Sequence, residues 1–187
     1  MTNVLAISGS VRAGSFNSML IHAARELVPS GMIIEIYDGL REIPPYDGGL
    51  DTPTPPAPVA DLRARIAAAD ALLISTPEYN YGVPGVLKNA IDWASTPPRD
   101  SVLRDKPVVL MGASPTPFGT VRAQLALRQT FLSTGSPVVA KPEVLVFNAH
   151  ERFDADGRLT DEGTAELVSG LLAVLDADLR APMPVAV

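Results

Sequence analysis

The sequence predicts an α/β domain in which helices cover both faces of a parallel β-sheet. Short apolar runs typical of strands alternate with longer amphipathic segments typical of helices along the whole chain. The 187 residues suit a single domain spanning residues 1–187 and are too few for two ordinary ones. Hydrophobic residues make up 47% of the chain, so it can bury a sizeable core.

The expected strands are short apolar runs bounded by turn-forming residues. The first, NVLAIS at residues 3–8, ends in a Ser/Gly cluster. Further strands are expected at residues 32–37, 71–75 and 107–112. The last strand is expected to be interrupted, with its parts at residues 137–140 and 143–147.

The expected helices carry apolar residues at helical spacing. They are expected at residues 16–27, around residues 62–69, and at residues 84–94, 119–132 and 160–179. The second is marked by Leu62, Ile66 and Ala69, and the third has Pro84 in its first turn, where proline is tolerated. Asp161 lies at the electropositive N-terminus of the last helix, where its negative charge stabilises the helix.

Five strands alternating with five helices fit a flavodoxin-like, doubly wound, five-stranded parallel sheet with helices on both faces. The connection at residues 38–58 holds six of the 18 prolines and is long for a compact domain. It is interpreted equally as a functional or interface segment and as a surface excursion.

The composition excludes several classes of function. Asp and Glu outnumber Lys and Arg by 21 to 15, and the net charge of −6 disfavours nucleic-acid binding. The chain has no Cys and only two His, which excludes disulfides, Fe–S clusters and Cys- or His-rich metal sites. No apolar run approaches the roughly 20 residues of a membrane span. No secretory signal is visible either, so we expect a cytoplasmic protein.

Ligands of open α/β sheets bind beyond the carboxyl ends of the strands. Three loops are expected to leave strands there, at residues 9–16, 76–83 and 113–118. We therefore expect these three loops to build the site.

The first of these loops has the composition of a phosphate cradle. Gly9 and Gly14 permit close backbone approach, and the following helix offers free N–H groups at its N-terminus. Short polar or cationic side chains are supplied by Ser10, Arg12, Ser15 and Asn17. These groups suit one terminal phosphate, and a polar turn with an N-cap is the equal alternative.

Two related phosphate-binding motifs are absent. Gly9 and Gly14 mimic the glycines of a P-loop, but Ser15 stands where the lysine is needed, which disfavours a nucleoside triphosphate. The loop also lacks the G-x-G-x-x-G pattern of a dinucleotide pyrophosphate site. Asp38 stands where dinucleotide-binding folds place a ribose-binding acid, but the glycine pattern that accompanies such an acid is missing.

The second loop is the most specific stretch of the sequence. Tyr79, Asn80 and Tyr81 lie at its tip, between Pro77 and Pro84. Such a loop can lay backbone amides and aromatic edges along a flat heterocycle. It is equally typical of a rigid turn whose aromatic rings pack against the core.

The run PEYNYGVPGVLKNAIDW, residues 77–93, closely resembles the signature of the NADPH-dependent FMN reductase family, which includes quinone, azo-dye and chromate reductases. The first loop, GSVRAGSFN, resembles the phosphate loop of the same family. LREIPPYDGGLD, residues 40–51, resembles its proline-containing loop. The resemblance spans roughly residues 3–147, with the motifs in the same order.

This resemblance implies non-covalently bound FMN, with NADPH or NADH as co-substrate. The residues implied at the phosphate end are Ser10, Arg12, Ser15, Phe16 and Asn17. The residues implied along the isoalloxazine ring are Pro77, Glu78, Tyr79 and Asn80, with Ala113 and Ser114 on the third side. The third loop has fewer hydroxyls than the family's Ser/Thr-rich turn and two extra prolines.

The resemblance also implies ping-pong turnover, in which NAD(P)H reduces the flavin and a quinone, azo compound, free flavin or similar small molecule then takes the electrons. No catalytic side chain and no metal are expected. Glu78 is interpreted as a structural group and Trp93 as a core residue. The alternatives are a flavodoxin-like electron carrier without direct NAD(P)H turnover and a non-enzymatic flavin-binding protein.

Members of this family are commonly dimers and sometimes tetramers, so we expect a homodimer or homotetramer. Arg122 and Glu143 match polar interface positions of the tetramers, whereas Leu125 stands where those proteins have Tyr. Lys88 and Asp92 are four residues apart on one helical face and are interpreted as a surface or interface pair.

Overall fold

The computed structural model describes residues 1–181 of the chain. Its strands are β1 (Thr2–Ser8), β2 (Met32–Tyr37), β3 (Ala71–Ser75), β4 (Val108–Ala113) and β5 (Val144–Val146). Its helices are α1 (Phe16–Glu26), α2 (Ala57–Ala68), α3 (Gly85–Ala94), α4 (Val121–Thr134) and α5 (Glu162–Arg180), with 3₁₀ turns η1 (Gly39–Glu42) and η2 (Ala149–Glu151). The expected domain of residues 1–187 includes residues 182–187, which lie outside the described part.

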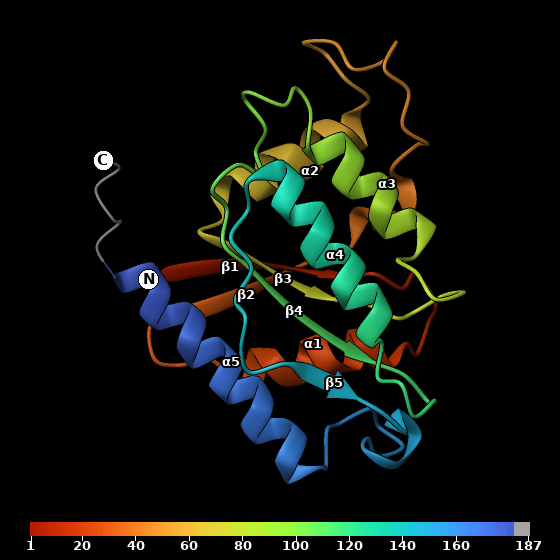
Figure 1. Cartoon of the computed structure of the whole chain (residues 1–187), viewed down its shortest axis with the longest axis vertical. Helices are drawn as coiled ribbons and strands as arrows, with labels where there is room; N and C mark the ends of the chain where they lie inside the picture. Colours follow the sequence, from red (N-terminus) through yellow and green to blue (C-terminus); the bar gives the residue numbers. More distant parts are fainter. Residues whose placement is uncertain (182–187) are drawn as a thin grey trace.

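The strands form one parallel sheet in the order β2-β1-β3-β4-β5. Val4 of β1 pairs with Ile34 on one side and with Ala71 on the other, so β1 and β3 form the centre of the sheet. The chain therefore leaves β1 toward β2 and later returns toward β3, as the doubly wound prediction required. All carboxyl ends lie at one edge, on the right in Figure 1.

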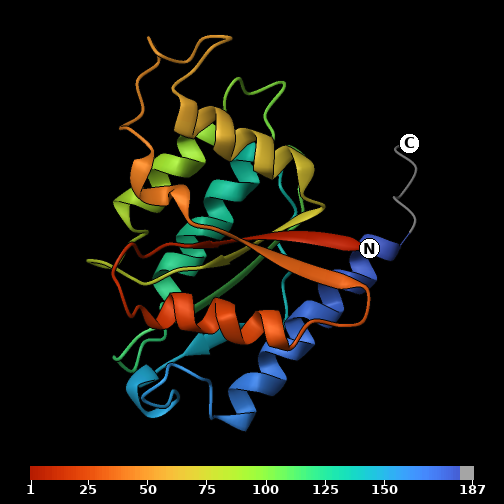
Figure 2. The same ribbon diagram turned by 180° about the vertical axis from the view of Figure 1, so that it is seen from behind.

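Two helical layers cover the sheet (Figures 1 and 2). α2, α3 and α4 lie on one face, and α1 and α5 lie on the other. Strand residues alternate between the two resulting cores: Val4 and Ala6 pack toward α1 and α5, whereas Leu5 and Ile7 pack toward α2, α3 and α4. Burial on both faces explains why the strands read as continuous apolar runs.

Some element boundaries differ from the sequence-based expectation. The fourth helix begins at Val121 rather than at residue 119, because Gly119 and Thr120 both have positive φ angles, of 53° and 67°. The expected loop at residues 38–58 contains η1 at its start, and α2 already begins at Ala57. The interruption of the last strand is confirmed, since Val138 makes an isolated bridge to Val108 and β5 follows separately.

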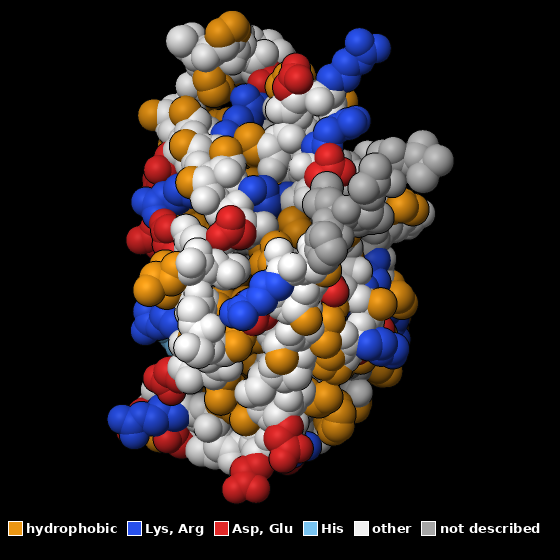
Figure 3. Space-filling model, turned by 90° about the vertical axis from the view of Figure 1, so that its left-hand side faces the viewer, with side chains coloured by type: hydrophobic (Ala, Val, Ile, Leu, Met, Phe, Trp, Pro, Cys, Tyr) orange, Lys and Arg blue, Asp and Glu red, His pale blue; other side chains and the backbone are white. Residues whose placement is uncertain are grey.

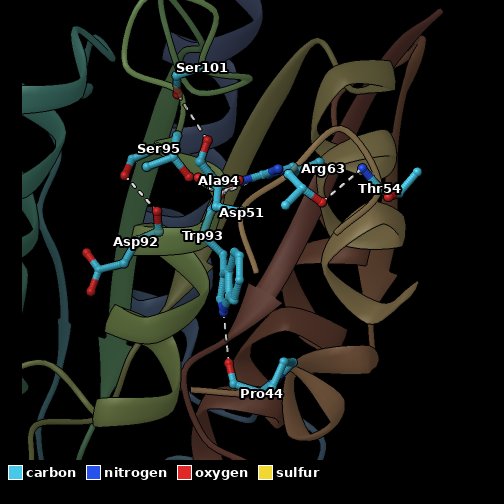
Figure 4. A network of polar contacts seen from close by, with 11 residues as sticks. Pro44, Asp51, Thr54, Arg63, Asp92, Trp93, Ala94, Ser95 and Ser101 are labelled. Atoms are coloured by element: carbon cyan, nitrogen blue, oxygen red, sulfur yellow. Dashed lines mark hydrogen bonds and ion pairs between the residues drawn. The ribbon is translucent and has the colours of Figure 1, made fainter. Parts of the chain in front are cut away.

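The long loop after η1 is tied to α2 and α3 by a polar network (Figure 4). Arg63 of α2 donates to the Asp51 carboxylate at 2.8 Å and to the carbonyl oxygen of Trp93. The Trp93 indole N–H donates to the carbonyl oxygen of Pro44 at 2.8 Å. Trp93 itself is fully buried, which confirms its assignment to the core. These hydrogen bonds hold the loop against α2 and α3, although the residues that bond to it are distant in sequence.

Figure 3 shows the face on the opposite side from the carboxyl ends of the strands. Lys, Arg, Asp and Glu side chains are interspersed there with hydrophobic ones. Within residues 1–181, no helix combines the length and the apolar character needed to cross a membrane. The same residues contain no group of three or more His, Cys, Asp or Glu side chains placed to hold a metal ion.

Candidate functional site

Three loops meet at the carboxyl edge of the sheet, as predicted. The β1–α1 loop (residues 9–15), the β3–α3 loop (76–84) and the β4–α4 loop (114–120) leave neighbouring strands. Between them lies a hollow of about 360 Å³, here called the central hollow. It is lined by Ser10, Arg12, Ser15, Phe16, Asn17, Pro77, Tyr79, Ala113 and Pro115. All except Pro115 belong to the predicted site.

The remaining predicted residues, Glu78, Asn80 and Ser114, line a second hollow of about 270 Å³. Tyr81, Thr116, Phe118 and Arg122 complete its wall, and it is here called the aromatic hollow. Residues of the two hollows alternate along the same two loops, so the hollows adjoin one another. The sequence-based site missed Pro115, Tyr81, Thr116 and Phe118, whose proximity to predicted residues in the same loops was the available signal.

Asn17 holds the three loops together. Its buried side-chain oxygen accepts hydrogen bonds from the Ser75 hydroxyl at 3.0 Å and from the Ala113 N–H at 2.9 Å. Its amide nitrogen donates to the Ala113 carbonyl oxygen at 2.9 Å. These bonds occupy both acceptor positions of the Asn17 oxygen. The side chain therefore joins the first turn of α1 to the ends of β3 and β4, and any ligand contact falls to its remaining amide hydrogen or its backbone.

The N-terminus of α1 forms an anion-binding cradle. Ser15 is the N-cap, and its hydroxyl accepts the backbone N–H of Asn17 at 3.2 Å. The backbone N–H groups of Gly14, Ser15 and Phe16 have no hydrogen-bond acceptor within residues 1–181. Such N–H groups and the helix dipole favour a bound anion. Arg12 adds a positive charge beside them, held in place by donating to the Gly14 carbonyl oxygen at 2.9 Å.

The tip of the β3–α3 loop is a tight turn from Tyr79 to Gly82. The backbone N–H groups of these two residues each donate to the other's carbonyl oxygen, at 3.1 and 3.0 Å. Asn80 and Tyr81 lie between them with φ angles of 49° and 66°, the left-handed conformation that turns of this type require. In the described part of the chain, the N–H groups of Glu78 and Asn80 have no acceptor. They are therefore available to the edge of a flat polar ligand.

Glu78 is confirmed as a structural group. Its carboxylate accepts the backbone N–H groups of Arg122 at 2.9 Å and of Ala123 at 3.3 Å, and it pairs with the Arg122 guanidinium at 2.9 Å. Thr120, the N-cap residue of α4, makes no side-chain cap itself. Glu78 therefore caps α4 from a different loop, which satisfies N–H groups that the helix leaves unpaired.

Arg122 stands between two exposed aromatic rings at the wall of the aromatic hollow. Its guanidinium carbon lies 4.0 Å from the centre of the Tyr81 ring and 4.5 Å from the centre of the Phe118 ring. Both distances are within the range of cation–π attraction. Glu78, Arg122 and the two rings thus form one connected wall beside the predicted ring-binding loop.

The polar groups of the β4–α4 loop are largely engaged inside the protein. The Ser114 N–H donates to the Val146 carbonyl oxygen at 2.9 Å, and its hydroxyl shares a hydrogen bond with that of Thr116 at 2.8 Å. The Ala113 N–H is already donated to Asn17. The N–H groups of Ser114 and Thr116 are therefore used inside the protein, whereas those of Phe118, Gly119 and Thr120 have no acceptor within residues 1–181.

Further charged residues singled out in the sequence form ion pairs within the chain. Lys88 and Asp92 form an exposed ion pair at 2.6 Å, as interpreted from their spacing. Glu143, which matches an interface position of the family's tetramers, forms an ion pair with Lys141 at 3.0 Å. Neither pair lines the central or the aromatic hollow.

Comparison with known proteins identifies the family of this chain. A sequence model described as NADPH-dependent FMN reductase matches residues 2–151. An NAD(P)H-dependent FMN reductase of Pseudomonas aeruginosa is 48% identical over 177 residues, which cover 95% of each chain. A quinone reductase of Escherichia coli is 37% identical over 171 residues, which cover 90% of each.

Among solved structures, the flavoenzyme NAD(P)H:(acceptor) oxidoreductase FerB of Paracoccus denitrificans superimposes with a TM-score of 0.86. It is 32% identical, and the match covers 96% of this chain and 97% of that protein. An azoreductase of Bacillus anthracis, at 15% identity and a TM-score of 0.59, shares the fold. The flavodoxin-like prediction is thereby confirmed, and the chain belongs to the NADPH-dependent FMN reductase family.

Proposed function

We propose that this protein binds FMN across the central and aromatic hollows and passes electrons from NAD(P)H to quinones and similar small acceptors. The observation that carries the proposal is the pair of free N–H clusters at the two ends of the site. One lies at Gly14, Ser15 and Phe16, and the other at Glu78 and Asn80. A ligand with an anionic tail and a flat polar head fits both.

At the phosphate end, the N–H groups at the start of α1 bind the anion and Arg12 supplies the countercharge. Ser10 contributes its hydroxyl, which lies 3.5 Å from that of Tyr79 across the central hollow. Ser15 and Asn17 hold the cradle in shape, because their side chains already bond to the protein. Phe16 contributes its backbone N–H. Its ring stacks on the ring of Phe153, with the two ring centroids 5.8 Å apart.

At the ring end, the backbone N–H groups of Glu78 and Asn80 face the polar edge of the heterocycle, and Pro77, Tyr79, Ala113 and Ser114 enclose it. When bound there, FMN would supply the redox chemistry between the nicotinamide nucleotide and the acceptor. The chain contributes position and electrostatic stabilisation through fixed N–H dipoles. The proposal therefore assigns no catalytic side chain.

The acceptor class is proposed from the relatives and from the shape of the site. The Escherichia coli relative is a quinone reductase, and the side chains beside the ring position include the exposed rings of Tyr79 and Tyr81. Aromatic surfaces of this kind favour flat, apolar acceptors such as quinones, azo compounds and flavins.

We also propose a cytoplasmic homodimer or homotetramer built from one domain of residues 1–187. The exposed face of α4 supports the oligomer, because Leu125 and Leu132 are seven residues apart and 57% and 80% exposed. A stripe of this kind on one helical face suits an interface between copies. Sedimentation velocity of the purified protein tests this: a monomer at micromolar concentration would contradict it.

The functional test uses purified protein reconstituted with FMN. We expect quenching of FMN fluorescence on binding, and faster multiple-turnover oxidation of NADPH or NADH when a quinone, azo dye or free flavin is added. Arg12→Ala is expected to weaken FMN binding by about tenfold or more, because it removes a charge-assisted contact.

Arg25→Ala is the control, since Arg25 is an exposed arginine in the last turn of α1 and lines neither hollow. Its FMN affinity should equal that of the wild type. A wild-type protein that stays colourless after FMN addition and oxidises no NAD(P)H would overturn the proposal.

A further inference from the structure

A third hollow lies on the other side of the β1–α1 loop. It has a volume of about 340 Å³, within the range of small-molecule sites. The β1–α1 loop, one side of α1, the end of β2 and η1 enclose it, and it is here called the β2 hollow. Ser10 and Arg12 line both this hollow and the central hollow, so the loop forms a wall between the two.

The floor of the β2 hollow is apolar. Val11, Ile21, Ile36 and Leu40 line it, from the loop, α1, β2 and η1 respectively. Ile21 and Leu40 are buried, and Val11 and Ile36 are partly buried. A floor of this kind suits the face of a flat ring rather than a bare ion.

The rim carries three charged groups without ionic partners. In the described part of the chain, Arg12, Arg41 and Asp38 form no ion pair. The guanidinium groups of Arg12 and Arg41 are instead held by backbone carbonyl oxygens, of Gly14 and Val11 respectively. A carbonyl orients a guanidinium without neutralising its charge. Because Arg12 is already proposed to face the FMN phosphate, Arg41 is the positioned cation that remains available to a second anion at this rim.

The positions of Asp38 and Arg41 indicate which ligand fits. Asp38 directly follows β2, and Arg41 follows three residues later in η1. In doubly wound sheets that bind dinucleotides, a carboxylate at this place accepts a hydrogen bond from the ribose 2′-hydroxyl of NADH, whereas a nearby arginine accommodates the 2′-phosphate of NADPH. The apolar floor next to these groups would then face the adenine ring.

We propose that the β2 hollow binds the adenosine end of the nicotinamide nucleotide, with Arg41 at the 2′-phosphate of NADPH and Asp38 at the ribose hydroxyls of NADH. The nicotinamide would reach the central hollow across the loop that carries Ser10 and Arg12. The G-x-G-x-x-G pattern is not required, because the pyrophosphate passes over this loop instead of lying in it. The proposal rests on the proposed function for the identity of the nucleotide.

The test measures binding directly by calorimetry on the FMN-loaded protein, with adenosine 2′,5′-bisphosphate, 5′-AMP and inorganic phosphate as separate probes. The bisphosphate should bind more tightly than 5′-AMP, and inorganic phosphate more weakly than either. Arg41→Ala should weaken the bisphosphate by about tenfold or more while leaving 5′-AMP nearly unchanged. Asp38→Asn should weaken 5′-AMP, whose ribose keeps its 2′-hydroxyl, and should not weaken the bisphosphate.

Arg25→Ala again serves as the control and should leave all three affinities unchanged. Equal binding of the bisphosphate and 5′-AMP would overturn the role of Arg41, and equal binding of inorganic phosphate would overturn the adenosine site. If the Arg41→Ala protein binds the bisphosphate normally, the bisphosphate binds outside the β2 hollow and the proposal is wrong. Repeating the titration on FMN-free protein separates this inference from the proposed function, because the β2 hollow does not require FMN for its lining.

Discussion

The carboxylate of Glu78 accepts both the backbone N–H and the guanidinium of Arg122, each at 2.9 Å, across 44 residues of sequence. This contact fastens the ring-binding β3–α3 loop to the start of α4. It also places the Arg122 guanidinium between Tyr81 and Phe118. The Glu78 side chain therefore both holds the β3–α3 loop in position and stabilises the start of α4.

Glu78→Ala should lower the free energy of unfolding by about 2 kcal/mol, because it removes a helix cap together with an ion pair. Glu78→Gln keeps an acceptor for the helix N–H groups and should cost about half as much. Urea denaturation measures both values. As a control, Asp92→Asn breaks the exposed Lys88 pair and should change stability by less than about 0.5 kcal/mol. Equal values for the two Glu78 variants would contradict the capping role.

Asn17→Ala should destabilise the protein by about 3 kcal/mol, since it leaves the buried Ser75 hydroxyl and the Ala113 N–H and carbonyl without their partner. FMN affinity should fall with it, because the three loops lose their common anchor. Urea denaturation and FMN fluorescence titration measure the two effects.

If Asn17→Ala does not fold, Asn17→Asp offers a second measurement. The carboxylate keeps both acceptor contacts but faces the Ala113 carbonyl oxygen, so we expect a loss of stability that is smaller at acidic pH, where the carboxyl protonates. An Asn17→Asp protein as stable as the wild type at pH 7 would show that the Nδ2 contact is unimportant.

Gly14→Ala and Gly85→Ala form a matched pair, because an added Cβ meets no heavy atom within 4 Å at either position. Gly14 has a φ of +66°, so alanine there should cost about 1 kcal/mol of stability. Gly85 is the first residue of α3, where alanine should be neutral or stabilise the helix by up to about 1 kcal/mol. Thermal unfolding of the two variants checks the signs, and the same sign for both would refute the backbone argument.

The ion pair of Asp51 with Arg63 predicts a loss of stability in acid. Hydrogen bonds from Arg63 and then Thr96 hold the pKa of Asp51 below its ordinary value of 3.8. Because the folded pKa is the lower one, the stabilisation is complete above about pH 4 and is lost as the pH falls through the folded pKa. Asp51→Asn should therefore lower the free energy of unfolding at pH 7, by about 1 kcal/mol, and the difference should shrink below about pH 4.

Urea denaturation from pH 3 to pH 7 measures this difference. Asp156→Asn is the control, since its pair with Arg158 is 3.7 Å long and both side chains are more than two-thirds exposed. The difference in free energy of unfolding between Asp156→Asn and the wild type should stay constant over this pH range. A constant Asp51→Asn difference across the whole pH range would contradict the assignment.

Local sequence patterns determined most of the fold of this protein. Apolar runs placed the strands, helical spacing placed the helices, and glycines and prolines bounded the loops, because each of these signals depends on neighbouring residues alone. The two site loops were recognisable for the same reason, since each is a continuous segment after a buried strand. Boundaries that depend on backbone angles, such as the start of α4 after Gly119 and Thr120, were not visible in the pattern.

Tertiary structure alone decided how those segments are joined. The bond from Asn17 to Ala113 spans 96 residues, and that from Arg41 to Val11 spans 30. Periodicity carries no information on such pairings, because they arise only when the strand order brings separate loops to one edge of the sheet. For that reason the sequence indicated which residues line the candidate site, whereas the structure determined which of them offer free hydrogen-bonding groups and which are already bonded within the protein.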